Sequence, residues 1–185
     1  MDTVMIDQIN PVNQNLKIIN NLLNVANTVA GILLTSKKDT SNDDLVFECM
    51  RIIGTSLDVD RLEVWQNEKR DEKLYAVMIH QWQTPLGELG RSHSPVLEIA
   101  YDDTPGWEKR LQQAECINGV TTELSQEDQD FLTDYSIKSV FVMPLFIENN
   151  FWGMFIIDNC HESKVFTDNE ILILKLIRLH IESNY

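Results

Sequence analysis

Basic residues are scarce in this sequence of 185 residues, which has 15 lysines and arginines against 29 aspartates and glutamates. The formal net charge of −14 opposes binding to the phosphate backbone of nucleic acids or to anionic lipid surfaces. Cysteine is also rare, and Cys49, Cys116 and Cys160 are widely spaced without a Cys-x-x-Cys pair. That pattern is typical of reduced thiols in a cytosol rather than of a disulfide framework.

Membrane and metal signals are missing as well. The longest apolar run near the C-terminus, ILILKLI at 171–177, is far shorter than a bilayer span, and residues 1–14 lack the basic and apolar regions of a signal peptide. The four histidines show no metal-ligand spacing. We therefore predict a cytoplasmic protein without membrane contact in this segment, without a metal site and without a cofactor. Residues 1–14, which are polar and contain Pro11, are interpreted as a leader before one domain at 15–185.

The stretch 136–159 predicts a β-hairpin at the centre of the fold. Two apolar runs, 139–147 and 151–158, are joined at Asn149-Asn150, a dipeptide that tolerates the positive φ angles of a tight turn. Both faces of both runs are apolar, so we expect both faces of the sheet to be covered. Pro144 cannot donate a ladder hydrogen bond and indicates a bulge or an unpaired stretch.

The N-terminal helix, predicted over 15–36, carries two apolar stripes with spacings of three and four residues. The first stripe is heptad-like and predicts a dimer interface; it consists of Leu16, Ile19, Leu23, Ala26, Ala30 and Leu33. The second consists of Ile18, Leu22, Val25, Val29 and Ile32. Two stripes let the helix face its own sheet and a second body, although one wide buried face explains them equally well.

Further elements follow in order along the chain. Capping residues at 40–44 precede a helix at about 43–57, and runs at 59–67 and 74–82 form a second hairpin around a charged turn. Residues 83–94 are predicted as a loop and 95–101 as a short edge strand. Thr104-Pro105 starts a short helix that Asn118-Gly119 ends, and Ser125 starts another.

The C-terminal helix begins at a capping box, Thr167 to Glu170. Its polar stripe is so narrow that we expect most of its circumference to be buried. With helices at both ends and strands between them, the order of elements predicts an α+β fold. In this fold the N- and C-terminal helices lie together on one face of an antiparallel sheet of five or six strands, and the short helices of 104–135 cover the other face.

Taken in order, the chain resembles a GAF domain, a small-molecule-sensing module of signalling proteins. The resemblance covers about residues 20–183, and its matching pieces are Leu22-Leu23 to Leu34, Val59-Asp60-Arg61 with Trp65 and Asn67, Trp107 and Leu111, Ile137-Lys138-Ser139, Met143-Pro144-Leu145, Phe151-Trp152-Gly153, and Phe166 to Glu170. The chain is most similar to input domains of bacterial sensor histidine kinases, with diguanylate cyclases as the next context. The resemblance implies six strands, a pocket between sheet and crossing helices, homodimerisation through terminal helices, and a fused kinase or cyclase output domain in a longer protein.

The ligand pocket is expected to have an aromatic wall. Of the four tryptophans, Trp82 and Trp107 are the candidates for it, with Leu111 beside Trp107 on the crossing helix. The resemblance adds Phe131, Tyr135, Ser139 and Phe141, and Asp158 is a candidate polar anchor. Alternatively, most of the tryptophans are core residues and Asp158 only caps a turn.

The predicted function is a non-catalytic sensory module that binds an unknown small molecule and signals through dimerising terminal helices. A ligand-free dimerisation scaffold of a diguanylate cyclase or kinase is the first alternative. The second is a free methionine-(R)-sulfoxide reductase of the GAF fold, although 127–138 lack the cysteine which that resemblance requires. Bilin attachment at Cys160-His161 is disfavoured because this cysteine follows the last hairpin strand, whereas the attachment cysteine of phytochrome-like GAF domains precedes the first. Cyclic nucleotide binding is disfavoured because Cys160 follows Asn159, where the GAF domains that bind cyclic nucleotides have a lysine.

Overall fold

The computed structural model describes residues 3–35, 42–89, 97–104 and 106–182. Its helices are α1 (Thr3–Thr35), α2 (Asn42–Leu57), α3 (Pro85–Leu89), α4 (Trp107–Gln112), α5 (Gln126–Thr133) and α6 (Asp168–Glu182), with 3-10 turns η1 (Tyr101–Asp103) and η2 (Thr121–Glu123). Its strands are β1 (Arg61–Arg70), β2 (Lys73–Gln83), β3 (Glu98–Ala100), β4 (Ile117–Val120), β5 (Ser139–Ile147) and β6 (Asn150–Asn159).

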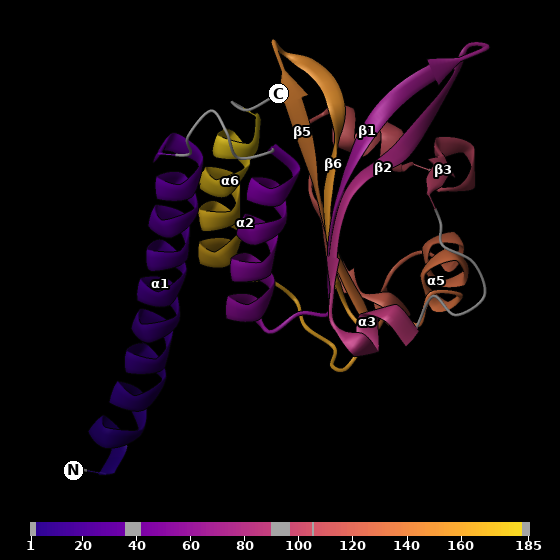
Figure 1. Cartoon of the computed structure of the whole chain (residues 1–185). Coiled ribbons are helices and arrows are strands. Elements are labelled where there is room, and N and C mark those ends of the chain that lie inside the picture. The colour runs from indigo at the N-terminus through magenta and orange to yellow at the C-terminus, as the bar shows by residue number, and fades with distance from the viewer. Residues whose placement is uncertain (1–2, 36–41, 90–96, 105, 183–185) are drawn as a thin grey trace.

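One antiparallel sheet with the order β3-β2-β1-β6-β5-β4 separates two hydrophobic cores. Figure 1 shows α1, α2 and α6 on one side of the sheet and α5 on the other. The predicted α+β fold, the sheet of six strands and the packing of the two terminal helices on each other are therefore confirmed.

Both long hairpins close with two-residue turns whose central residues have positive φ. Those residues are Asp71 and Glu72, at 47° and 65°, and Glu148 and Asn149, at 50° and 64°. This is the conformation whose twist matches that of the flanking strands. The predicted turn Asn149-Asn150 was wrong by one residue, because Asn150 already pairs with Ile147.

Pro144 lies where β5 has a strand on only one side. Pairing with β4 ends at Val142, so the absent N–H of Pro144 costs no ladder hydrogen bond on that side. The predicted bulge lies one residue further on, between Leu145 and Phe146. The end of α6 covers this edge, since the Phe146 amide donates to Glu182 Oε1 at 2.6 Å.

Helix α1 differs from its prediction in start and in neighbours. It begins at Thr3 rather than at Asn15, so most of the predicted leader is helical. It packs on α2 and α6, which lie between it and the sheet (Figure 1). Leu22, Val25 and Val29 of the second stripe are buried in this contact.

Part of the apolar surface of the helical layer is exposed. Leu172, Leu176 and Leu179 lie on one stripe of α6 and are 60%, 43% and 53% exposed. The expectation that most of this helix is buried was therefore wrong. Only the side of α6 that carries Ile173, Leu174 and Ile177 meets the core.

By length and composition, the stretch Leu16–Leu34 of α1 could cross a membrane, with a mean hydropathy of 1.2. The prediction of no membrane contact rested on the shorter run 171–177 and did not take this stretch into account. The same composition is found in helices that pack against a domain, and Leu22, Val25 and Val29 do so here.

The middle of the chain differs in three places from the prediction. The predicted loop 83–94 contains helix α3, and within 97–101, the described part of the predicted edge strand, the strand β3 covers Glu98–Ala100. The crossing helix α4 ends at Gln112, where Ala114 adopts a left-handed φ of 61°, and Asn118-Gly119 lies within β4 instead of ending the helix. Thr40, Ser41, Pro95 and Pro105, which were predicted to start elements, lie outside the described residues.

Candidate functional site

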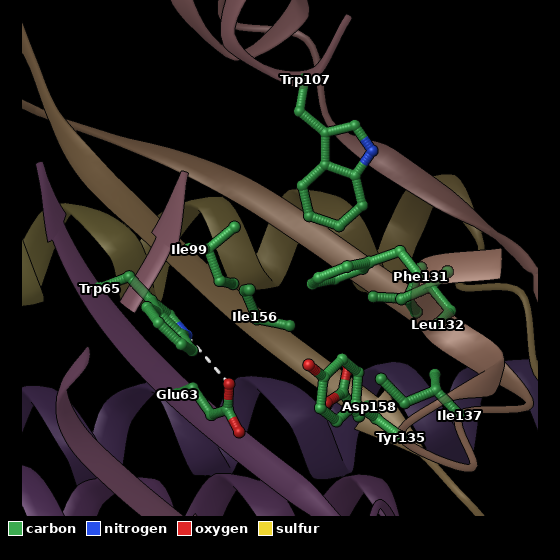
Figure 2. A pocket seen from close by; sticks show the side chains of 11 residues that line it. Glu63, Trp65, Ile99, Trp107, Phe131, Leu132, Tyr135, Ile137, Ile156 and Asp158 are labelled. Carbon is green, nitrogen blue, oxygen red and sulfur yellow. Dashed lines mark hydrogen bonds between the residues drawn. The ribbon is translucent and has the colours of Figure 1, made fainter. Parts of the chain in front are cut away.

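A small cavity lies between the sheet and the short helices α4 and α5. About 20 Å³ within it is open to the centre of a water molecule, which is room for about one water. Figure 2 shows two carboxylates at one end and the indole of Trp107 at the other. The lining residues are Glu63, Trp65, Ile99, Trp107, Phe131, Leu132, Tyr135, Ile137, Val140, Ile156 and Asp158.

Strand alternation determines which side chains reach the cavity from the sheet. On β1, Glu63 and Trp65 face it, whereas Leu62 and Val64 face the helical core. On β6, Ile156 and Asp158 face it by the same alternation. The floor of the cavity therefore comes from two neighbouring central strands, β1 and β6.

Two carboxylates are buried in this floor. Glu63 is 1% exposed and accepts hydrogen bonds from the Trp65 indole Nε1–H at 2.9 Å and from Gln81 Nε2 at 3.2 Å. Asp158 is also 1% exposed and forms an ion pair with Arg61, with 3.2 Å between Oδ2 and Nε. Burying such groups is costly, so each is held by specific partners.

The roof consists of aromatic side chains from α4 and from α5 with its following turn. Trp107 Nε1–H donates to Asp128 Oδ1 at 2.6 Å, and both residues are buried. Phe131 contacts the Trp107 and Tyr135 rings edge to face, with centroids 6.1 Å and 5.3 Å apart. Phe131 and Tyr135 are only half-buried, so the roof meets solvent at these two rings.

Four of the eight predicted ligand-binding residues line the cavity, namely Trp107, Phe131, Tyr135 and Asp158. Leu111 is buried in the same core without lining the cavity. Whether any of these residues binds a ligand remains a prediction.

Three predicted site residues lie on the wrong face of the sheet. Ser139 and Phe141 alternate with Val140, which lines the cavity, so they face the helical layer. Trp82 pairs with Leu62 across β1 and β2, and its ring contacts α2 at Gly54. On β5 the sequence could not separate the two faces, because both are apolar there.

Sequence reasoning missed Glu63 and Trp65, which form the floor together with Asp158. The sequence Arg61-Leu62-Glu63-Val64-Trp65 carries the signal, since charged and aromatic residues alternate with aliphatic ones. A buried strand with two charged residues on one face is unusual, and that observation alone could have found the floor.

A second polar cluster lies beside the site at the start of β1. Asp60 Oδ2 accepts from the amides of Cys160 and His161 and lies 2.8 Å from His161 Nδ1, while Thr84 donates to Oδ1. Burial raises the pKa of Asp60, but these hydrogen bonds outweigh burial and leave the pKa below its usual value. The hydrogen bond to Asp60 raises the pKa of His161. This cluster ties β1, β6 and the segment before α3 together.

The three thiols are poor nucleophiles. Burial raises the pKa of Cys49 and of Cys160 to about 11, and it also raises the pKa of Cys116. A reactive thiolate needs a lowered pKa in an electropositive surrounding. Among the described residues that line the cavity there is no cysteine.

The predicted dimer stripe on α1 is divided by the fold. Leu16 and Leu23 are 52% and 41% exposed, whereas Ala26 is buried in the chain itself at 7%. Ile19, Ala30 and Leu33 are half-buried. The exposed part of the stripe therefore consists of residues seven apart, and Ala26 belongs to the core.

Comparison with known proteins identifies the family to which this fold belongs. The GAF domain family matches residues 41–183. A curated relative, the methanogenesis regulatory histidine kinase FilI of Methanothrix harundinacea, is 21% identical over 137 residues; the match covers 72% of this chain and 15% of the relative. The chain thus spans about one seventh of the length of that relative.

Solved structures share the fold at low identity. The phycocyanobilin-bound GAF domain of a cyanobacterial phytochrome superposes with a TM-score of 0.69 at 14% identity, covering 88% of this chain and 92% of that one. The GAF domain of a Coxiella burnetii phosphoenolpyruvate-protein phosphotransferase gives 0.66 at 12%, covering 89% and 92%. With its six-stranded sheet, its paired terminal helices and a family match over most of its length, the chain belongs to the GAF domain family.

Proposed function

We propose that this GAF domain is the non-catalytic input module of a signal-transduction protein. In this proposal a small molecule enters the cavity under α5, and the change in packing reaches the terminal helices and a fused histidine kinase. The observation that carries the proposal is the cavity itself, which combines a buried polar floor with an aromatic roof whose Phe131 and Tyr135 rings are half-buried. The relative that is named a histidine kinase supports the kind of output domain.

A ligand of useful size must displace part of the roof. Because the present space holds about one water, Phe131 and Tyr135 are the side chains that must move. Both belong to α5 and the turn after it, a short segment held by the Ser125 cap and by the Trp107–Asp128 hydrogen bond. Binding would therefore be coupled to the position of α5.

The test of sensing is a thermal denaturation screen against a small-molecule library. Compounds that bind the cavity should raise the melting temperature, and the rise should vanish in Ile156→Phe, which fills the cavity from its floor. Ile99→Val, a smaller change in the same lining, is the matched control and should keep the response. A library without stabilising compounds, or stabilisation that survives Ile156→Phe, would reject sensing at this site and favour the scaffold alternative.

We infer that a second copy of the chain covers the exposed leucines. Leu172, Leu176 and Leu179 follow a spacing of four and three residues, and Leu16 and Leu23 are seven apart. This is the spacing of a helical dimer seam, in which identical stripes pack on each other. The seam proposed here consists of these five leucines and omits Ala26.

Sedimentation equilibrium tests this seam. Wild type should be a dimer, and Leu176→Glu should be a monomer, because a charge in the centre of an apolar seam is left without a partner. Leu97, which is 57% exposed beside β3, provides the control Leu97→Glu, which should stay dimeric. A monomeric wild type at micromolar concentration would reject the dimer while leaving sensing open.

The enzymatic alternative is less well supported. A sulfoxide reductase needs an activated thiolate at its pocket, whereas burial raises the pKa of all three thiols. The location in the cytosol remains part of the proposal and rests on the reduced thiols and the acidic composition.

A further inference from the structure

One end of the cavity is closed by the turn that follows α5. This turn, residues 134–136 (the roof turn), carries the Tyr135 ring at the end of the cavity that holds the carboxylates (Figure 2). Leu132 before the turn and Ile137 after it are buried, whereas Ser136 is exposed. The roof turn is therefore a short, partly exposed segment between two buried anchors.

Ser136 gives the roof turn a backbone conformation that few residues adopt. Its φ is 57°, in the left-handed region that residues other than glycine populate sparsely. Such a conformation persists where surrounding contacts hold it. The amides of Ser136 and Ile137 donate to the carbonyls of Thr133 and Leu132, at 2.9 Å and 3.1 Å. If Ser136 relaxes from this φ, these two hydrogen bonds break, so both amides report the opening of the turn.

Arg61 connects the roof turn with the floor of the cavity. Its guanidinium is 0% exposed. Nη2 donates to the Tyr135 carbonyl at 3.0 Å and to Cys160 Sγ at 3.3 Å, and Nε lies 3.2 Å from Asp158 Oδ2. Arg61 is the first residue of β1, and Asp158 and Cys160 lie at the end of β6 and directly after it. Two partners thus hold the guanidinium on the sheet, and the third belongs to the turn.

The bond between Arg61 and the Tyr135 carbonyl is the one that breaks when the roof turn moves. Because Asp158 and Cys160 hold the guanidinium, it stays with the sheet while the turn leaves. The Tyr135 ring moves with its own backbone and vacates one end of the cavity. A hydrogen bond from a charged donor is stronger than a neutral one, so this contact favours the closed position.

We propose that Arg61 is the positioning residue of this site. Its hydrogen bond to the Tyr135 carbonyl holds the roof turn closed, and a ligand enters when this bond breaks. The inference rests on the proposed sensory function and names the residue that regulates access to its site. Arg61 is not among the residues that line the cavity, so it acts through Tyr135 rather than by contact with the ligand.

The variant Arg61→Lys tests this role. Lysine keeps a positive charge for Asp158, but its single nitrogen cannot occupy the positions of both Nε and Nη2. Losing a hydrogen bond from a charged donor should raise the population of the open turn at least about tenfold. Amide hydrogen exchange measures this population residue by residue. Exchange at Ser136 and Ile137 should therefore accelerate at least about tenfold more than exchange at the paired amides of β5 and β6.

Arg178→Lys is the matched control. Arg178 also donates to a backbone carbonyl, that of Pro144 at 3.5 Å, but it does so from α6 on the opposite side of the sheet (Figure 1). Exchange at Ser136 and Ile137 should stay at its wild-type rate in this variant. If Arg61→Lys accelerates these two amides no more than those of β5 and β6, Arg61 only stabilises the fold and the proposal is wrong.

Ligand affinity is a second readout, which a loss of stability alone would not improve. A compound that stabilises the wild type but not Ile156→Phe is titrated into Arg61→Lys by isothermal calorimetry. Because the open form is more populated in Arg61→Lys, the affinity should rise, by up to the factor measured for the opening of the turn. Equal or weaker binding to Arg61→Lys would overturn the proposed control of access.

If Arg61→Lys does not fold, the wild type decides the question. The protons on Arg61 Nη2 should exchange with the same opening free energy as the amides of Ser136 and Ile137, because one event exposes them all. The Nε proton, which Asp158 holds, should exchange more slowly. Nη2 protons that are as well protected as the Nε proton would refute the proposal.

Failure of this inference differs from failure of the sensory function. Compounds that bind the cavity, together with unchanged exchange at Ser136 and Ile137 in Arg61→Lys, would reject the role of Arg61 and leave sensing intact. A library without any binding compound would reject sensing, and the admission of a ligand by Arg61 falls with it.

Discussion

The close approach of β1 and β6 beneath the cavity makes Gly153 a sharp test of the fold. A Cβ at this position would lie 2.0 Å from the carbonyl oxygen of Trp65. An ordinary contact begins at 3.4 Å, so the two strands must part locally by about 1.4 Å. Because the obstacle is backbone rather than a flexible side chain, rotamer changes cannot relieve it.

We expect Gly153→Ala to lower the free energy of unfolding by about 3 kcal/mol, combining about 2 kcal/mol of overpacking with about 1 kcal/mol for a weakened ladder hydrogen bond. For a domain of this size that corresponds to a fall in melting temperature of about 6–12 °C. Urea denaturation followed by tryptophan fluorescence gives the free energy directly.

Gly31 provides the matched control on α1, because a Cβ there meets nothing within 4 Å. Gly31→Ala should stabilise the protein by about 0.5–1 kcal/mol, because alanine loses less backbone entropy than glycine in a helix. If Gly153→Ala costs less than about 1 kcal/mol, the pairing of Gln66 with Gly153 is wrong, and so is the floor of the cavity built on it.

Three further predictions concern the polar contacts around the site. Trp107→Phe removes the donor to buried Asp128 and should cost about 2–3 kcal/mol in urea denaturation; a cost below 1 kcal/mol would show that the hydrogen bond is unimportant. Ser125→Ala removes the α5 cap and should cost about 1 kcal/mol, with a larger increase of hydrogen exchange in α5 than in β6. The pKa of His161 is raised in the fold, so its protonated form stabilises the fold fully below pH 6.5, and this contribution is lost as pH rises through the folded pKa. The pKa of Asp60 is lowered in the fold, so its ionised form stabilises the fold above pH 3.8, the ordinary value, and this contribution is lost as pH falls through the folded pKa. His161→Gln should therefore remove the loss of stability above pH 6.5 and keep the loss of stability at acidic pH. An unchanged loss above pH 6.5 would contradict the pairing of His161 with Asp60.

Local chemistry in the sequence determined where α5 and α6 begin. Thr167 and Glu170 exchange hydrogen bonds as a capping box should, and Ser125 caps α5 through the Asp128 amide. Such signals act within four residues, so no tertiary contact is needed to recognise them. The hairpin at 136–159 was equally predictable, although its turn moved by one residue because cross-strand pairing sets the register.

Which face of the sheet holds the cavity was decided by tertiary structure alone. Val140 and Phe141 are adjacent and both apolar, so neither hydrophobicity nor alternation shows which of them meets α5 and which meets α2 and α6. The same holds for α1, where Leu22 and Leu23 differ only in what packs on them. The sequence by itself determined that both faces must be covered, because both strands of the hairpin at 136–159 are apolar on both sides. Only the packing of the helices assigned the aromatic roof and the two carboxylates to one of these faces.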